Sequence, residues 1–188
     1  MHPRQPLSHP SARQPLPRRW LMTDPRMGEA LWDAVTALPR GSGVILRHYD
    51  SDRATRQAML ARLNQIAVRR QLMLVVAGRD ALNGREVAGT HGRHRGALTA
   101  PVHSRRQAIA AIRAGAKLLF ASPVHPTRSH PGTPALGPVR LGLMIRGLRV
   151  PVIALGGMHE RRWRALRPMG VYGWAGIDSW TARVGHPH

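Results

Sequence analysis

The sequence contains no cysteine among its 188 residues. That absence excludes disulfide bonds, thiolate-bound metal centres and a cysteine nucleophile. Long hydrophobic runs are missing too, since the longest, Leu72–Ala77, is far too short to cross a bilayer. The basic N-terminus is not followed by the apolar stretch of a secretory signal peptide. We therefore expect a cytoplasmic protein that does not associate with membranes.

Lysine and acidic residues are scarce. Lys117 is the only lysine among 29 basic residues, so the other 28 are arginine, and nine acidic residues leave a formal net charge of +20. A charge of this size favours polyanionic partners such as nucleic acids. However, the arginines are spread along the whole chain, and a composition bias of the genome would also favour arginine over lysine. Nucleic-acid binding is therefore kept as a second alternative function.

Hydrophobic residues make up 43% of the chain, which is ordinary for a folded protein, and the length suits one domain with its own core. Residues 1–19 differ, because five prolines prevent a continuous helix or sheet ladder there. We predict a disordered basic arm over residues 1–19, one domain over 20–183 and a short tail over 184–188.

From Trp20 onwards, short apolar runs alternate with stretches of helical periodicity. Nearly continuous apolar strands are buried on both faces, which indicates a parallel sheet. Eight such runs predict a closed (β/α)8 TIM barrel, compact because the helices after the third and fourth strands are reduced to loops; an open doubly wound sheet is the main alternative. The predicted strands are Trp20–Thr23, Gly43–Arg47, Leu72–Ala77, Glu86–Thr90, Ala97–Ala100, Lys117–Ala121, Pro151–Leu155 and Val171–Ile177. The predicted helices are Pro25–Leu38, Asp50 or Ser51 to Arg70, Ser104–Ala114, Val139–Leu148 and His159–Met169.

Five segments carry distinctive residues in a fixed order: Trp20–Asp24, Val44–Arg47, Val102–Ser104, Pro123–Thr127 and Pro151–Met158. Together they resemble the thiamine phosphate synthase/TenI family, in which the last two segments read Pro-Val-Phe-Pro-Thr and Pro-Val-Val-Ala-Ile-Gly-Gly-Ile. The resemblance extends from Trp20 to about Trp180. It implies a TIM barrel of thiamine biosynthesis, a transferase that joins an aminopyrimidine diphosphate to a thiazole phosphate.

Barrels of this type bind ligands at the carboxyl ends of their strands, with phosphate held after strands seven and eight. Gly156 and Gly157 directly follow the seventh predicted strand, and glycine lets backbone N–H groups approach an anion closely. A plain tight turn is the other interpretation. Arg47 ends the second strand, where a guanidinium could clamp a diphosphate with two hydrogen bonds. In so arginine-rich a chain, a solvated side chain is an equal alternative.

The segment after the sixth predicted strand holds Thr127, Ser129 and His130. The resemblance implies that this loop presents hydroxyls and a lysine to phosphate groups. Thr127 matches in place, and His130 stands at the lysine position. His125 and His130 are the candidate catalytic residues, because histidine exchanges protons near neutral pH. A loop histidine without a catalytic role is the alternative for His125.

The resemblance also implies Mg²⁺, held by aspartates after strands three and four to neutralise the diphosphate. Here those strands run into Ala77-Gly78-Arg79, with Asp80 offset, and into His91-Gly92-Arg93, so the carboxylate ligands are missing. At the end of strand eight, Asp178 stands where the family has a phosphate-facing serine, and Ser179 is the expected substitute.

Two functions therefore stand ahead of nucleic-acid binding. The first is a thiamine phosphate synthase-like transferase whose catalytic site is degraded. The alternative is a TenI-like protein that binds or isomerises a phosphorylated ligand without metal. In both cases the expected partner is a small phosphorylated thiazole or pyrimidine, and the oligomeric state is left open, a homodimer included.

Overall fold

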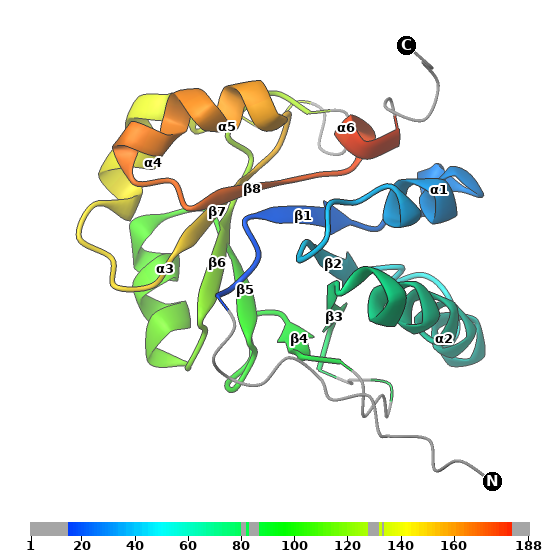
Figure 1. The fold of residues 1–188 in the computed structure, drawn as a ribbon. Helices are drawn as coiled ribbons and strands as arrows, with labels where there is room; N and C mark the ends of the chain where they lie inside the picture. The colour runs from blue at the N-terminus through cyan, green and yellow to red at the C-terminus, as the bar shows by residue number, and fades with distance from the viewer. Residues whose placement is uncertain (1–14, 80–81, 83–86, 128–131, 133, 182–188) are drawn as a thin grey trace, which may run out of the picture.

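Eight short strands pair side by side, each parallel to the next, and the last returns to the first (Figure 1). The computed structural model describes residues 15–79, 82, 87–127, 132 and 134–181. Leu21 in the first strand lies opposite Gly176 in the last, so the sheet closes on itself and the barrel prediction is confirmed over the open sheet. The strands are β1 (Arg19–Met22), β2 (Gly43–Leu46), β3 (Met73–Ala77), β4 (Gly89–His91), β5 (Thr99–Val102), β6 (Leu118–Ala121), β7 (Val152–Leu155) and β8 (Gly173–Gly176).

Helices cover the barrel unevenly. In Figure 1, α1 and α2 lie on one side and α3, α4 and α5 on the other. Among the described residues, no helix follows β3 or β4, as the sequence predicted. The helices are α1 (Ala30–Thr36), α2 (Arg53–Arg70), α3 (Arg105–Arg113), α4 (Gly137–Ile145), α5 (Glu160–Leu166) and α6 (Asp178–Thr181), with single 3-10 turns η1 (Pro25–Met27) and η2 (Arg167–Met169).

Local chemistry decides where these helices begin. The Asp52 side chain accepts from the Thr55 N–H at 2.9 Å and caps α2, so this helix starts one or two residues later than predicted. Ser104 caps α3 in the same way, as predicted. The single helix expected over Pro25–Leu38 is wrong. It is divided at Gly28, whose positive φ of 50° ends the 3-10 turn before α1 begins.

Two aromatic rings pack together in the core beside a glycine. Trp20 is fully buried and meets Phe120 edge to face, with ring centroids 5.3 Å apart. Gly43 lies opposite Trp20 on β2, and a Cβ there would come within 2.2 Å of the indole ring. The glycine at the start of β2 therefore makes room for the indole ring of Trp20.

The folded part starts before Trp20, which corrects the predicted boundary of the N-terminal arm. Arg19 is already in β1, and the carbonyl of Arg18 accepts from the Trp174 N–H at 2.8 Å. The Tyr172 hydroxyl donates to the carbonyl of Leu16 at 2.5 Å. Prolines in this segment lack an N–H, but their neighbours' carbonyls still serve as acceptors, which is why the segment can pack against β8. Residues 1–14 and 182–188 lie outside the described residues.

No helix in the described part of the chain has the length and apolar character needed to cross a membrane.

Candidate functional site

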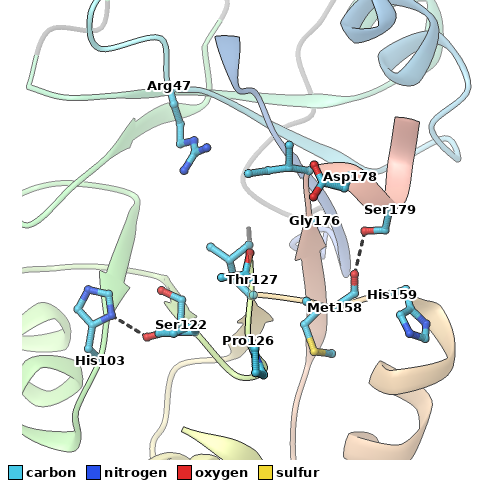
Figure 2. Close-up of a pocket in the computed structure, with 15 residues that line it drawn as sticks. Arg47, His103, Ser122, Pro126, Thr127, Met158, His159, Gly176, Asp178 and Ser179 are labelled. Carbon is cyan, nitrogen blue, oxygen red and sulfur yellow. Dashed lines mark hydrogen bonds between the residues drawn. The ribbon is translucent and has the colours of Figure 1, made fainter. Parts of the chain in front are cut away.

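The carboxyl ends of the strands surround a pocket of about 490 Å³ (Figure 2). Five residues predicted from the sequence line it: Arg47, Thr127, Gly156, Gly157 and Ser179. Two other predicted residues, Ser129 and His130, lie outside the described residues. The pocket therefore brings together residues that follow β2, β6, β7 and β8.

The turn after β7 is shaped by its two glycines. Gly156 and Gly157 have positive φ angles of 96° and 57°. A Cβ on Gly157 would lie 2.8 Å from the carbonyl oxygen of Pro126, so the turn packs tightly against the loop after β6. Their N–H groups donate to no acceptor among the residues that the structure describes. The turn thus combines a packing role with two free donors at the edge of the pocket.

The β8 edge of the pocket offers little to an anion. The Ser179 hydroxyl donates its single hydrogen to the carbonyl of Met158 at 2.8 Å (Figure 2). Asp178, its exposed neighbour, also lines the pocket and is acceptor-only when ionised. Ser179 is therefore in the predicted place, but its hydrogen is already used within the protein.

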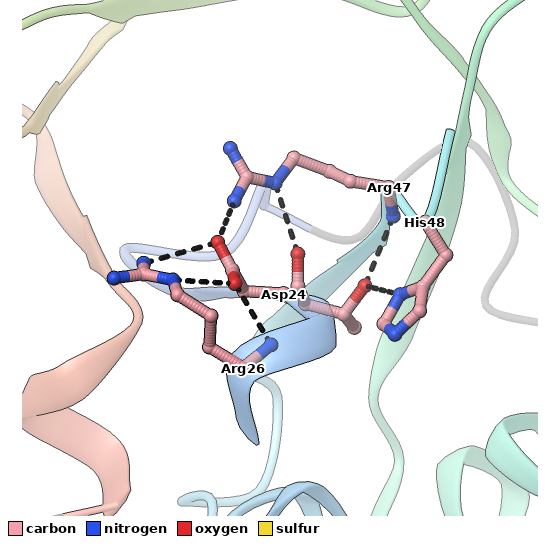
Figure 3. Close-up of polar contacts among 5 residues, drawn as sticks. Asp24, Arg26, Arg47 and His48 are labelled. Atoms are coloured by element: carbon pink, nitrogen blue, oxygen red, sulfur yellow. Dashed lines mark hydrogen bonds and ion pairs between the residues drawn. The ribbon is translucent and has the colours of Figure 1, made fainter. Parts of the chain in front are cut away.

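Arg47 is held rigidly by the end of β1 (Figure 3). Its Nε donates to the carbonyl of Thr23 and its Nη2 to Oδ2 of Asp24, both at 2.9 Å, while its backbone N–H donates to the Thr23 hydroxyl. Asp24 also binds Arg26, whose hydrogen bonds lower the pKa of the Asp24 carboxyl. Burial lowers the pKa of Arg47, but a guanidinium stays protonated near neutral pH. Figure 2 shows it turned toward the pocket.

Two histidines that sequence reasoning did not select line the pocket: His103, at the end of β5, and His159, at the start of α5. The Nδ1 of His103 donates to the carbonyl of Ser122 at 2.7 Å, which leaves Nε2 as an acceptor. Burial lowers the pKa of His159. His125, the candidate named from the sequence, is not among the lining residues and lies with its Cβ beside Gly157. Position at a strand end was the signal that could have identified His103.

His91 is a third titratable group near the site, inside the barrel at the end of β4. It is 4% exposed, its Nδ1 shares a hydrogen bond with the Thr99 hydroxyl at 2.8 Å, and its ring meets the edge of Phe120. Burial lowers its pKa to about 4, and the positive charge of Arg47 acts in the same direction. His91 is therefore neutral near physiological pH.

Comparison with known proteins places this geometry in a family. The model of thiamine monophosphate synthase matches residues 86–179. A thiamine-phosphate synthase from Salinispora tropica is 31% identical in an alignment that covers 87% of this chain and 89% of that protein. The chain belongs to the thiamine monophosphate synthase family. A second thiamine-phosphate synthase, from Salinispora arenicola, is 30% identical over 86% of this chain and 88% of its own length.

Two solved structures of thiamine phosphate pyrophosphorylases have the same fold as this chain. The thiamine phosphate pyrophosphorylase from Pyrococcus furiosus superposes with a TM-score of 0.71 at 20% identity, covering 86% of this chain and 85% of that one. The thiamine phosphate pyrophosphorylase from Bacteroides thetaiotaomicron gives a TM-score of 0.53 at 16% identity, covering 87% and 83%.

The magnesium ion that the family resemblance implies does not fit the donors present. Mg²⁺ prefers oxygen ligands, usually carboxylates. β3 ends at Ala77 and is followed by Gly78 and Arg79, while β4 ends at His91 and is followed by Gly92 and Arg93. Within the described ranges, no group of three histidines or carboxylates gathers that could hold a metal ion. This member of the family therefore lacks, in its described part, the metal ligands expected at these strand ends.

Proposed function

We propose that this protein joins an aminopyrimidine diphosphate to a thiazole phosphate, producing thiamine phosphate and pyrophosphate. The thiazole nitrogen supplies an electron pair to the methylene carbon of the pyrimidine. The bond between that carbon and the diphosphate oxygen breaks, and the diphosphate leaves with its electron pair. Family membership and the names of the relatives support this reaction.

The observation that carries the proposal is the placement of anion-binding groups around one pocket. Arg47 comes from the end of β2, and the free N–H groups of Gly156 and Gly157 come from the end of β7. The lining between them is largely apolar. Pro126, Leu155 and Ile177 provide surfaces on which the pyrimidine and thiazole rings could pack. Such a pocket suits two phosphorylated heterocycles, one with its diphosphate toward Arg47 and one with its phosphate toward the glycine turn.

Within this arrangement the residues have separate roles. The Asp24 carboxylate and the Thr23 carbonyl orient the guanidinium of Arg47, so its remaining N–H groups are directed before substrate arrives. With Nδ1 donating to Ser122, the Nε2 of His103 can accept a hydrogen bond from an amino group of the pyrimidine. The reaction as written moves no proton, so it requires no general base.

A second function is favoured by one observation. Asp178 and the occupied hydroxyl of Ser179 weaken the β8 side of the phosphate site, which suits a TenI-like binding protein or isomerase without transferase activity. Thiamine phosphate formation from both substrates, measured by chromatography in chelator and in magnesium, tests the proposal. Product that disappears in Arg47→Gln supports the transferase. Tight calorimetric binding of thiamine phosphate without any turnover would favour the second function instead.

A further inference from the structure

The rim formed by β2, β3 and β4 carries cations where the family resemblance implies a metal. Arg47 follows β2, and Arg56 lies in the first turn of α2 beside β3. Apart from Asp24, which is already shared between Arg47 and Arg26, no carboxylate contacts these two guanidinium groups in the described part of the chain. The net charge at this rim is therefore positive, which favours binding of a negatively charged diphosphate without a metal ion to neutralise it.

Arg47 has donors to spare. A guanidinium carries five N–H groups in a planar fork. Here Nε binds the Thr23 carbonyl and one Nη2 N–H binds Asp24. The other N–H groups have no acceptor among the described residues, and the side chain, 19% exposed, faces the pocket. Thr23 and Asp24 therefore orient the guanidinium through Nε and Nη2, and its remaining N–H groups can bind a ligand.

Arg56 adds a second cation at the neighbouring strand end, because Leu46 on β2 lies opposite Val76 on β3 and Arg47 and Ala77 follow these two residues. Its Nη2 donates to the carbonyl of Ala77, the last residue of β3, at 2.7 Å. Its Nε is buried and has no hydrogen-bond partner in the described part of the chain. A buried charged donor without an acceptor is costly to leave unpaired, and a neighbouring anion would compensate that charge.

The charges of Arg47 and Arg56 affect the pKa values of the same two neighbouring residues, His48 and Tyr49. Burial lowers the pKa of His48, and the charges of Arg47 and Arg56 lower it further, against the opposing effect of Asp24. Burial raises the pKa of Tyr49, and the charges of Arg47 and Arg56 both oppose that rise. Both guanidinium groups therefore lie close enough to this segment to influence the same two side chains.

Resting on the function proposed above, we propose that this chain binds the diphosphate leaving group through Arg47, supported by the charge of Arg56, without a divalent cation. As the carbon–oxygen bond breaks, the departing oxygen gains its electron pair and negative charge. The free fork of Arg47 donates two hydrogen bonds to the diphosphate, and the charge of Arg56 at the adjacent strand end lowers the energy of the added negative charge. The fixed guanidinium charges replace those of the metal.

Calorimetric titration of the full chain with inorganic pyrophosphate, in chelator and in magnesium, tests this proposal. We expect binding in chelator, and weaker binding when magnesium is added, because the metal competes for the same phosphate oxygens. Arg47→Gln and Arg56→Gln should each weaken binding about tenfold or more, the first by removing hydrogen bonds and the second by removing charge. Arg69→Gln is the matched control, since Arg69 is exposed in the last turn of the same helix.

Arg56→Lys keeps the charge and should bind better than Arg56→Gln if that variant is folded by circular dichroism. Binding that requires magnesium, or magnesium-dependent binding removed by Asp80→Asn, would overturn the proposal. Equal affinity in Arg47→Gln and Arg69→Gln would overturn it too. Because pyrophosphate binding is measured apart from turnover, failure to form thiamine phosphate with intact metal-free binding would count against the proposed reaction and not against this site.

Discussion

The hydroxyl of Ser179 donates to the carbonyl of Met158 at 2.8 Å and so joins the turns that follow β7 and β8. This contact locks the two turns at one edge of the pocket. It also uses the only hydrogen that Ser179 could offer to a phosphate. The β8 edge therefore presents the Asp178 carboxylate, which repels phosphate, and the β7 edge presents the N–H groups of Gly156 and Gly157, which attract it. The affinity for phosphate depends on the balance between these two effects.

Asp178→Ser should strengthen phosphate binding. The change removes a carboxylate that lines the pocket and repels a phosphate, so we expect affinity to rise about fivefold for a charge pair in partly solvated surroundings. Titration of inorganic phosphate and thiamine phosphate, followed by calorimetry, measures the change. Asp33→Ser on the exposed face of α1 is the control for net charge. If both variants improve binding equally, Asp178 has no local effect on the site.

Gly157→Val should abolish phosphate binding at this turn. A side chain at a φ of 57° is strained, and its Cβ would meet the Pro126 carbonyl at 2.8 Å, which displaces the turn and its N–H donors. Gly41→Val is the matched control, because Gly41 has a φ of 73° with open space around it. Circular dichroism reports folding of both. A folded Gly157→Val that binds phosphate as well as wild type would mean the glycines form a turn only.

His91 should make the protein less stable in mild acid. Its folded pKa is about 4 against an ordinary value of 6.5, so the unfolded chain binds more protons between these values. The free energy of unfolding should therefore fall as pH drops from 6.5 toward 4, by up to about 3 kcal/mol. Urea unfolding of wild type and His91→Gln across this range measures it. An unchanged pH slope in His91→Gln would contradict the assignment.

Glu160→Gln should destabilise the closure of the barrel. Glu160 on α5 accepts two hydrogen bonds from Arg19 on β1, at 2.9 and 3.0 Å, and a third from the Trp174 indole. Hydrogen bonds from Arg19 lower the pKa of Glu160 to about 2. Because the pair is partly solvated, we expect a loss of about 1 kcal/mol near neutral pH.

The loss should shrink as pH falls from 4.5 toward 2, since protonation then removes the same charge from wild type. Urea unfolding measures it, with Glu29→Gln, an exposed change of the same kind, as control. A difference between wild type and Glu160→Gln that persists in strong acid would show that packing, and not the ion pair, is responsible.

Several features of the fold could be predicted from local sequence, and others could not. The continuous apolar runs at β3, β6 and β7 predicted their strands to within a residue or two. β4 and β5 lie two or three residues away from their predicted starts, because their sequences are short and mixed, so neighbouring strands decide their register. The division of the first helix at Gly28 was missed, since an isolated glycine within a helical pattern is often tolerated.

By itself, the sequence determined the alternation of eight apolar strands and the glycine turn after β7, because these depend on residues close together in the chain. Closure of the barrel over the open sheet was decided by the pairing of β1 with β8, which lie at opposite ends of the fold in sequence. Only the tertiary structure decided which groups are available to a ligand. Ser179 is occupied by Met158, Arg47 is oriented by Thr23 and Asp24, and His103 reaches the pocket where His125 does not. Hydrogen-bond availability depends on partners brought together by strand closure, and those partners are far apart in the sequence.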